Sequence, residues 1–531
     1  MKITIKTGAG VTGIACDEGA RLDDVILSAG VMLDRPCGGR GTCGKCRVRA
    51  DGGLSGVSAC ELKNLSERER AAGTRLACQT RVQGNAAVEL DAAAVSTDKT
   101  FSTGVDLETV GGEFGLAIDL GTTTVAAFIS GLDDGKVYAG NAVLNRQARY
   151  GAEVMGRMLA QERAGGLADA AWSSAVEAAA GLGLSERTRG RVTRAVVVGN
   201  SAMHHLMLGL PVDTLLRSPF TPHALGAVDA GTGPLTELFP AIEDVRFPPL
   251  LGGFAGSDPL ACLLYFGLGR DGENALALDL GTNGEVMLAT RGKTLVASTA
   301  AGPAFEGVNI SCGMRASAGA VTAAQWEGGA FKLTTVGGGA ARGLAGSGLL
   351  SAVRALVELG VIEPSGRMGE ASGAAPPVII KDGVKRVALG ADVFITQTDV
   401  RELQKAKAAV RAAVEVLLRR GRLRASELDR IILTGSFGGR LDPDDLLALG
   451  VLPGAPRGRI HSIANGAGMG AAMMLDAENF ARALELGAQV EHVELNLDPG
   501  FMDRYISHMV LAQEHAVMAG PERSIMKEGV L

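Results

Sequence analysis

Two segments of this chain repeat one local pattern. Residues 116–129 read LAIDLGTTTVAAFI, and residues 276–289 read LALDLGTNGEVMLA. In each segment an apolar run ends in Asp-Leu-Gly-Thr and a second apolar run follows. This pattern predicts a buried strand, a tight turn that glycine permits, and a return strand. One such segment could be an ordinary hairpin, but two in the same arrangement predict a duplicated fold whose halves face a common cleft.

A second pair of segments supports the duplication. Residues 196–201 (VVVGNS) and 431–436 (IILTGS) each predict a buried strand that ends in a glycine-containing turn before a helical stretch. A single Rossmann-type α/β domain is the alternative, but it does not explain why the pattern occurs twice. We expect two α/β halves, at about residues 115–270 and 271–475, with a closing segment over residues 476–515.

Each repeat places an aspartate at the end of its first strand. Asp119 and Asp279 supply hard oxygen ligands that can hold Mg²⁺ through water. The amides and hydroxyls of the turns that follow point toward whatever lies between the halves. Glu285 could orient an attacking water, or it could be only a carboxylate at a strand edge. The candidate binding residues in the two turns are Gly121, Thr122, Thr123, Thr124, Gly281, Thr282 and Asn283.

Four cysteines near the N-terminus form the second strong pattern. Cys37, Cys43 and Cys46 are separated by five and two residues, with glycines between them, and Cys78 follows in the stretch RLACQT. Four thiolates suit a 2Fe-2S cluster, and the glycines let backbone amides approach the sulfurs. Structural zinc is the alternative, but such sites usually show two short cysteine pairs, and one is present here. Cys60 lies between Cys46 and Cys78 and could in principle be the fourth ligand.

The sequence around these cysteines is consistent with a small α+β domain. Residues 2–7 and 11–16 alternate like two strands across a glycine turn, and residues 21–29 have the spacing of an amphipathic helix. Together with the cysteines, they resemble a plant-type or adrenodoxin-like ferredoxin domain over about residues 1–92. The resemblance implies a β-grasp fold, and it favours Cys78 as the fourth ligand because RLACQT matches the segment that carries the last ligand in that family.

The repeated segments resemble the nucleotide loops of the actin, hexokinase and heat-shock ATPase superfamily. DLGTTT is similar to the first phosphate loop, DLGTNGE to the second, and LTGSFGG to the adenosine loop. The resemblance implies a two-lobed actin-like ATPase domain over residues 115–515 that binds ATP with Mg²⁺. Further residues expected to contact the nucleotide are Gly346, Ser347, Gly435, Ser436, Phe437 and Gly438.

Other segments resemble the ATP-dependent reductive activators of corrinoid proteins. They include GNSAMHHLMLGLP at residues 199–211, PAFEGVNISCGMRASAGA at residues 303–320 and NGAGMGAA at residues 465–472. The resemblance extends from residue 115 to about residue 510. It implies a repair reaction in which one electron returns an inactive cobalt(II) corrinoid cofactor to cobalt(I), restoring a methyltransferase system. The partners implied are the corrinoid protein and an upstream low-potential electron donor.

The segment between the two predicted domains is polar and rich in Gly, Thr and Ser over residues 91–113. Such a composition is typical of a tether, and we place the linker at residues 93–114. In this interpretation nucleotide binding changes the angle between the two halves and so the contact with the corrinoid protein. Well-known relatives carry a longer linker and an extra small domain before the first phosphate loop.

Composition and hydropathy exclude several function classes. A formal net charge of −6 provides no basic surface for nucleic acid. No apolar run reaches the length of a membrane span, and the N-terminus does not have the pattern of a signal peptide, so we expect a cytoplasmic protein. Eight cysteines, four of them assigned to a cluster, fit a reducing compartment better than a disulfide framework.

Two other functions stay open at this point. One is activation of another low-potential metalloenzyme, such as a 2-hydroxyacyl-CoA dehydratase, which would need cysteines such as Cys312 to bridge a homodimer. The other is an ATP-binding redox regulator without turnover. His204 and His205 could be corrinoid or metal ligands, but a histidine on a helix packed at a strand end is more often a core residue. Cys262 is not spaced as a ligand.

Overall fold

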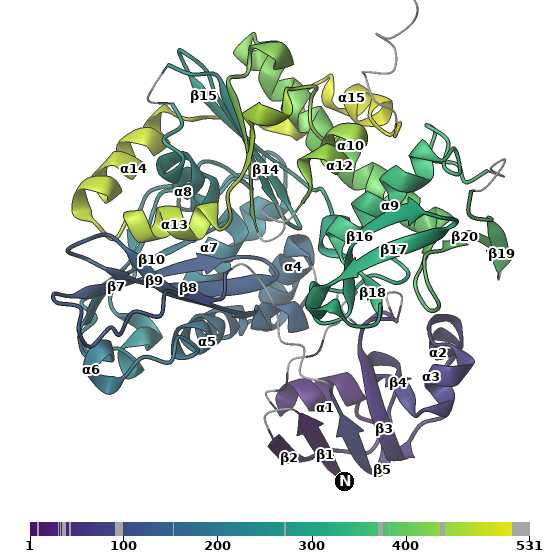
Figure 1. The fold of residues 1–531 in the computed structure, drawn as a ribbon. Coiled ribbons are helices and arrows are strands. Elements are labelled where there is room, and N and C mark those ends of the chain that lie inside the picture. The colour runs from purple at the N-terminus through teal and green to yellow at the C-terminus, as the bar shows by residue number, and fades with distance from the viewer. Residues whose placement is uncertain are drawn as a thin grey trace, which may run out of the picture.

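The computed structural model describes residues 1–511 except residues 8–9, 30, 32, 34–38, 42–43, 91–98, 152, 270–271, 370–374, 382 and 436–440. A small N-terminal domain lies below a body built from two large sheets and their helices (Figure 1). Within the described residues, no helix combines the length and apolar character that crossing a bilayer requires.

The N-terminal domain is a five-stranded mixed sheet in the order β2-β1-β5-β3-β4. Helix α1 packs on it, because Leu22 and Ile26 on one side of the helix meet Ile3, Ile5 and Leu76 of the sheet in one buried core. The arrangement is the α+β fold expected from the sequence. Its elements are β1 (Lys2–Thr7), β2 (Gly10–Ala15), α1 (Leu22–Ser28), β3 (Arg47–Leu54), α2 (Ala59–Asn64), α3 (Glu67–Ala71), β4 (Thr74–Leu76) and β5 (Val82–Glu89).

The first lobe is built on a seven-stranded sheet in the order β11-β12-β10-β7-β8-β9-β6. Strand β7 pairs antiparallel with β8 and parallel with β10, so the first repeat is a hairpin beside a crossover strand. Its elements are β6 (Phe101–Ser102), β7 (Phe114–Leu120), β8 (Thr124–Gly131), β9 (Val137–Leu144), α4 (Val154–Ala164), α5 (Leu167–Ala180), α6 (Glu186–Arg189), β10 (Val192–Gly199), α7 (Ser201–Leu208), β11 (Val228–Asp229), β12 (Asp244–Phe247) and α8 (Ser257–Tyr265).

The second lobe repeats this topology in a six-stranded sheet, in the order β23-β22-β13-β14-β15-β24. Strand β13 pairs antiparallel with β14 and parallel with β22, as β7 does with β8 and β10. The main elements are β13 (Ala275–Leu280), β14 (Gly284–Ala289), β15 (Thr294–Thr299), α10 (Gln397–Gly421), β22 (Arg430–Thr434), α12 (Pro443–Ala448), β23 (Ile460–Ser462), α13 (Gly466–Met473), α14 (Ala477–Gln489), β24 (Glu491–His492) and α15 (Phe501–Ser507).

Two small three-stranded sheets and helix α9 complete the second lobe. They lie between β15 and α10 in the sequence and form the part of the lobe nearest the N-terminal domain (Figure 1). Their elements are β16 (Ala320–Glu327), β17 (Ala330–Thr335), β18 (Gly343–Leu344), α9 (Gly346–Glu358), β19 (Ile379–Lys381), β20 (Val384–Ala388) and β21 (Phe394–Thr396).

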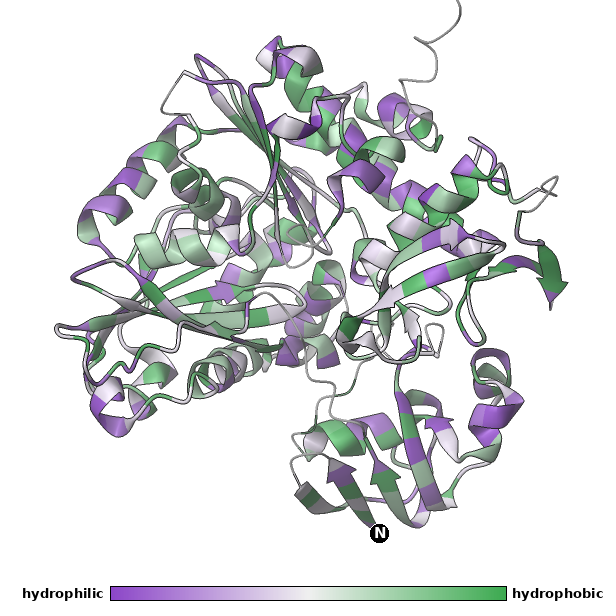
Figure 2. Cartoon of the chain, viewed as in Figure 1, coloured by the Kyte–Doolittle hydropathy of each residue, from purple (hydrophilic) through white to green (hydrophobic). Residues whose placement is uncertain are grey.

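Alternation along the repeated strands explains how the two lobes meet. In β7 the large residues Leu116 and Ile118 face the outer core with α5, while the small residue Ala117 faces inward. In β13 the large residue Leu278 faces the outer core with α10, and Ala277 faces inward. The two small faces sandwich α8 and α13, which form one layer between the sheets (Figure 1). Figure 2 shows apolar strands between helices whose outer surfaces are hydrophilic.

Residues 99–113, which the sequence places in the linker, lie against the first lobe. Strand β6 pairs with β9, and Leu107 and Val110 pack on the outer core of the lobe. The Arg191 guanidinium donates to the carbonyl oxygens of Leu107 at 3.3 Å and Gly112 at 2.9 Å. The remaining part of the expected linker, residues 91–98, lies outside the described residues.

The central helical layer gives a direct test of this packing. A Cβ atom on Gly470 of α13 would overlap the carbonyl oxygen of Ala261 on α8. Gly470→Ala should therefore lower the free energy of unfolding by about 1–3 kcal/mol, as overpacking does. Gly226→Ala is the control, because a Cβ there meets nothing within 4 Å. Thermal and urea unfolding of both variants make the measurement, and equal stabilities would contradict the close helix contact.

Candidate nucleotide and cluster sites

The turns of the two repeats meet in a pocket between the lobes. The hydroxyl oxygens of Thr123 and Thr282, one from each turn, are 3.0 Å apart. The pocket is lined by the following residues predicted from the sequence: Asp119, Gly121, Thr122, Thr123, Thr124, Asp279, Gly281, Thr282, Asn283, Glu285 and Gly435. The structure thus brings these residues from three separate stretches of the sequence to one place.

Backbone and amide hydrogen bonds fix the first turn. The Gly121 amide donates to the Thr124 carbonyl at 3.1 Å, and a Cβ at Gly121 would lie 2.6 Å from that oxygen. The side-chain amide of Asn145 donates to the Gly121 carbonyl at 2.9 Å, and that of Asn200 donates to the Thr122 hydroxyl at 3.0 Å. Asn145 and Asn200 therefore hold the turn from β9 and from the end of β10.

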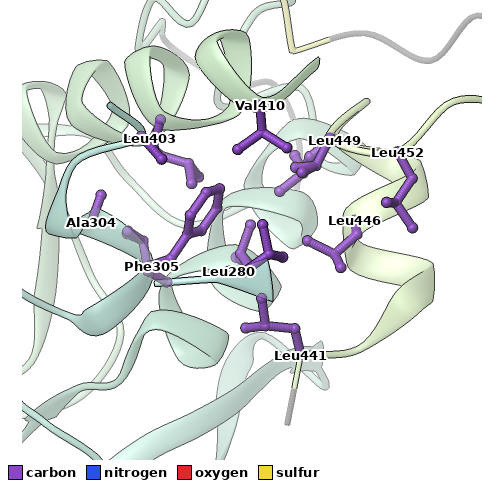
Figure 3. Packing of buried hydrophobic residues seen from close by; sticks show 14 of the residues in the cluster. Leu280, Ala304, Phe305, Leu403, Val410, Leu441, Leu446, Leu449 and Leu452 are labelled. Atoms are coloured by element: carbon purple, nitrogen blue, oxygen red, sulfur yellow. The ribbon is translucent and has the colours of Figure 1, made fainter. Parts of the chain in front are cut away.

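The second turn is fixed through Glu306. The Thr282 hydroxyl donates to the Glu306 carboxylate, which also lines the pocket. Glu306 follows Phe305, which is buried in the core below the turn together with Leu280, Leu403 and Val410 (Figure 3). Because Leu280 directly precedes the turn, one apolar cluster positions both the turn and the carboxylate that it contacts.

Acidic groups crowd the pocket. Burial raises the pKa of Asp279 to about 6, with Lys99 opposing and Asp119 adding to the rise. Burial and neighbouring carboxylates also raise the pKa values of Asp258 and Glu285 well above their ordinary values. These carboxyl groups are therefore destabilised in the ionised form, and a cation between them would stabilise it.

One lysine is part of this acidic site. Lys99 is buried, and its ammonium group forms an ion pair with the Asp119 carboxylate. Although burial alone would lower the pKa of Lys99, the charges of Asp119 and Asp279 raise it above the ordinary value. Lys99 is therefore a charged group inside the pocket.

The donor set fits a hydrated divalent cation. The Oδ1 atom of Asp258 is buried without a hydrogen-bond partner among the described residues. Among those residues, no three acidic, histidine or cysteine side chains converge closely enough to form a metal centre by themselves. The fit is thus to Mg²⁺ that completes its coordination with water and phosphate rather than to a cage of protein ligands.

Gly435 closes the pocket beside Asp279. It has a φ of 99°, and a Cβ there would overlap the Asp279 carboxylate, so only glycine suits this position. The next predicted residues, Ser436, Phe437 and Gly438, lie outside the described residues. Gly346 and Ser347 do not line the pocket, although Ser347 lines a neighbouring cavity of about 410 Å³ together with Arg354 and Asp442.

The cysteine site is described in part. Cys46 and Cys78 are buried and close together, since the Ala77 amide donates to the Cys46 carbonyl at 2.9 Å. The Gln79 side-chain amide lies 3.5 Å from the Cys78 sulfur, as a donor to that sulfur. Cys37 and Cys43 lie outside the described residues.

Glycines around these cysteines form a cradle that suits a cluster. Gly39, Gly41 and Gly44 all have positive φ values, of 86°, 76° and 62°. A Cβ on Gly41 would lie 2.7 Å from the Gln79 side chain and 3.1 Å from the sulfur of Cys60. The close turns fit a bound 2Fe-2S group, and they also bring Cys60 to the edge of the loop, where its sequence position alone does not place it.

The cysteine loop contacts the second lobe. The Lys45 ammonium donates to the Ile310 carbonyl at 3.2 Å and to the Gly313 carbonyl. Cys312 lies between these two residues and is partly buried, and burial raises the pKa of its thiol to about 11. This loop of the second lobe therefore extends from Glu306 in the pocket to Ile310 and Gly313, where it contacts the cysteine-bearing domain.

The other singled-out residues have structural surroundings. The Nδ1 atom of His205 lies 2.8 Å from the Ser201 carbonyl, and His204 packs edge-on against Phe247. Burial, helped by His205, lowers the pKa of His204 to about 3. Cys262 is buried in α8, with its sulfur 3.7 Å from the Asp279 carboxylate. Neither histidine lines the pocket, which agrees with a core role.

Sequence reasoning missed several pocket residues. Asn200 lies in VVVGNS and Glu306 in PAFEG, two segments whose resemblance was noted without a role for these side chains. Asp258 and Lys99 lie outside the repeated segments, so no sequence pattern pointed to them. The lining residues outside the predicted set are Lys99, Asn200, Asp258, Glu306, Asn465, Gly466 and Ala467.

Three family descriptions match the chain in consecutive order. Residues 8–83 match a 2Fe-2S iron-sulfur cluster binding domain, residues 114–271 match the RACo middle region, and residues 273–519 match the C-terminal domain of RACo, the ASKHA domain. The predicted fold class, a 2Fe-2S domain followed by an actin-like ATPase fold, is confirmed.

Relatives match across most of the chain. A solved structure of a reductive activator for corrinoid, iron-sulfur protein shares the fold, with a TM-score of 0.68 and 24% identity over 96% of this chain and 98% of that chain. The Co(II) methylated amine-specific corrinoid protein reductase of Methanosarcina barkeri is 24% identical over 60% of this chain and 63% of its own length. The corrinoid activation enzyme RamQ of Eubacterium limosum is 30% identical over 91% of this chain and 95% of its own length. The chain therefore belongs to the RACo family of corrinoid-protein activators, in which a 2Fe-2S domain is joined to an ASKHA domain.

Proposed function

We propose that this chain reduces the inactive cobalt(II) cofactor of a corrinoid protein to cobalt(I) by one electron, driven by ATP hydrolysis. The 2Fe-2S cluster of residues 1–92 passes the electron, and an upstream donor of low potential reduces the cluster again. The similarity to the corrinoid activation enzyme RamQ and to the Methanosarcina barkeri corrinoid protein reductase supports a corrinoid protein as the substrate. The pocket between the two lobes of residues 115–515 supports the proposal that the protein binds a nucleotide.

One observation carries the coupling between the two activities. The loop that begins at Glu306 contacts the Thr282 hydroxyl in the pocket, and it reaches the ammonium group of Lys45 between two predicted cluster ligands. A change in the second phosphate turn therefore acts on the loop that holds the cluster-bearing domain. A static regulator does not need such a contact, whereas an ATP-driven electron carrier does.

Electron transfer alone would run uphill in this reaction. Plant-type 2Fe-2S clusters have reduction potentials of about −400 mV, and reduction of a cobalt(II) corrinoid is expected to require a still lower potential. Nucleotide binding can shift the equilibrium only if ATP binds one arrangement of the lobes more tightly than another. The pocket between the lobes is suited to this requirement, because its two sides belong to different sheets.

The pocket residues divide the work of binding and hydrolysis. The turns that contain Thr122 and Gly281 would bind the phosphates, and Asp119 and Asp279 would hold hydrated Mg²⁺. Mg²⁺ supplies neutralisation of phosphate charge when it is bound. Glu285 lies opposite Asp279 in the β13–β14 register, and burial raises its pKa. In its ionised form, which a nearby cation favours, this carboxylate would accept a proton from water.

We place the adenosine on the side of the pocket where Gly435 closes it. The neighbouring cavity lined by Ser347 and Arg354 lies between α9 and β16. This assignment uses Gly346 and Ser347 at the start of α9 for the ribose and base. It also includes Ser436, Phe437 and Gly438 of the expected adenosine loop, which lie outside the described residues.

The function is tested by nucleotide hydrolysis with purified corrinoid protein. Addition of the cobalt(II) form should stimulate ATP hydrolysis, and the cobalt(I) form should not, because only the first is a substrate. The corrinoid protein without its corrinoid cofactor is the control, because it tests whether protein contact alone stimulates ATP hydrolysis. Stimulation by a 2-hydroxyacyl-CoA dehydratase and none by the corrinoid protein would support the other activator class and contradict this proposal.

The cluster ligands give a second prediction. Cys78→Ser should remove or strongly perturb the 2Fe-2S absorption and electron paramagnetic resonance signals of anaerobically purified protein, because it deletes one of four thiolates. Cys60→Ser and Cys16→Ser should leave two irons and two sulfides per chain. Loss of the cluster in Cys60→Ser with retention in Cys78→Ser would assign Cys60 as the fourth ligand instead.

The raised pKa of Asp279 gives a third prediction. Because its pKa is about 6 in the folded protein, the ionised carboxylate destabilises the nucleotide-free fold as the pH rises from about 4 to 6, and fully above that range. Asp279→Asn should therefore increase the free energy of unfolding near pH 7.5 by about 1–3 kcal/mol while abolishing ATP hydrolysis. The increase should shrink near pH 4.5.

Asp169→Asn is the matched control for that prediction, since Asp169 is exposed on α5. Its stability should change by less than about 0.5 kcal/mol. An Asp279→Asn variant that is less stable than the wild type near pH 7.5, or that still hydrolyses ATP normally, would contradict the described charge arrangement. Cluster content should be unchanged in both variants.

A further inference from the structure

Lys99 is an unexpected constituent of the pocket. Its side chain is 7% exposed, and lysine is almost never this buried unless it is paired. Among the described lining residues it is the one with a cationic side chain, and it shares the pocket with five carboxylates: Asp119, Asp258, Asp279, Glu285 and Glu306. Without Lys99, the charged side chains among the described lining residues would all be negative, which disfavours a polyphosphate.

The register of the first sheet explains how Lys99 reaches the pocket from the sheet edge. Phe101 pairs with Gly140 of β9, and its ring lies 6.3 Å from that of Phe128 on the inner face of the sheet. A Cβ on Gly140 would lie 2.5 Å from the carbonyl oxygen of Lys99, so glycine lets the segment approach β9 closely.

The path across the sheet is lined by small residues. Two positions from Gly140, Ala142 pairs with Ala126, which in turn pairs with Asp119. Both alanines belong to the same inner cluster as Phe101 and Phe128. The long side chain of Lys99 can therefore cross two strands and end at the Asp119 carboxylate, where larger residues would block it.

The position of Lys99 in the sequence gives this contact its importance. Lys99 directly follows residues 91–98, which join the ferredoxin domain to the first lobe. The first described side chain after this connection therefore ends in the nucleotide pocket. A ligand in the pocket would therefore lie next to Lys99, the residue that directly follows the connection to the ferredoxin domain.

We propose that Lys99 is a phosphate-binding residue of the nucleotide site and that it couples the occupancy of that site to the connection between the domains. In the described structure its ammonium group neutralises Asp119. In a complex with Mg²⁺ and a nucleoside polyphosphate, Asp119 would instead hold the hydrated Mg²⁺, and the ammonium group would bind a phosphate oxygen. The proposal rests on the nucleotide site proposed above and adds a residue from outside both repeats.

Equilibrium binding of ATP and ADP with Mg²⁺ to the full-length protein tests the phosphate contact. Lys99→Met should weaken binding by about tenfold to hundredfold, the range for loss of a hydrogen bond between charged groups. Lys99→Arg keeps the charge and should restore most of the affinity. Lys136→Met is the control, because Lys136 is 74% exposed on the surface and should not affect binding.

Hydrogen exchange of the wild-type protein tests the coupling and does not depend on whether Lys99→Met folds. Bound nucleotide should slow exchange of the amides of residues 99–103 as well as of the second turn, residues 281–285. In Lys99→Met the response at residues 281–285 should persist and that at residues 99–103 should be lost.

The outcomes separate this inference from the proposed function. A wild-type protein that binds no nucleotide would contradict the nucleotide site itself. A wild-type protein that binds nucleotide and responds at residues 281–285 but not at residues 99–103 would overturn only the role of Lys99. Unchanged affinity in a folded Lys99→Met variant would overturn it as well.

Discussion

Crowding of negative charge between two sheets is the constraint on which the structure depends. The duplicated hairpins bring Asp119 and Asp279 to the same pocket, and the central helix α8 adds Asp258. Burial makes ionisation of Asp279 and Asp258 unfavourable, and a nearby cation favours their ionised forms. Lys99 is the cationic side chain among the described lining residues, and in the proposed nucleotide complex Mg²⁺ would be a second cation.

The pocket is linked to the ferredoxin domain in two ways. One is along the chain, because Lys99 on the first lobe directly follows residues 91–98, which join the two domains in the sequence. The other runs from Glu306 on the second lobe through the loop that accepts hydrogen bonds from Lys45. Because the contacts come from different lobes, a change in the angle between the lobes would move them relative to each other. The fold therefore offers a mechanical reason for fusing an electron carrier to an ATPase.

The sequence predicted the parts of this structure that repeat or have regular spacing. The two Asp-Leu-Gly-Thr turns, the buried strands before them and the alternating strands of the ferredoxin domain lie where the patterns indicate. Alternation of large and small residues in β7 and β13 also follows from the sequence, although its purpose becomes evident only when α8 and α13 are seen between the small faces. The local pattern of residue types was sufficient to predict these elements, because the burial of each face of a strand determines which residues that face carries.

Contacts between residues that are far apart in the sequence could not be predicted from the sequence. Lys99 stands in a polar stretch typical of a linker, and only the β6–β9 pairing and the alanines beyond it bring its side chain to Asp119. Asp258 belongs to no repeat. The position of Cys60 between Cys46 and Cys78 made it an alternative fourth ligand, but only the structure shows that its sulfur lies beside the turn at Gly41.

In the proposed reaction, ATP drives an electron transfer that the cluster cannot complete alone. The most direct measurement is the fraction of corrinoid protein in the cobalt(I) form, followed by its absorption spectrum while the solution is held at the midpoint potential of the cluster. Addition of ATP with Mg²⁺ should raise this fraction well above its value without nucleotide, and ADP should not. An equal cobalt(I) fraction with and without ATP would contradict the account.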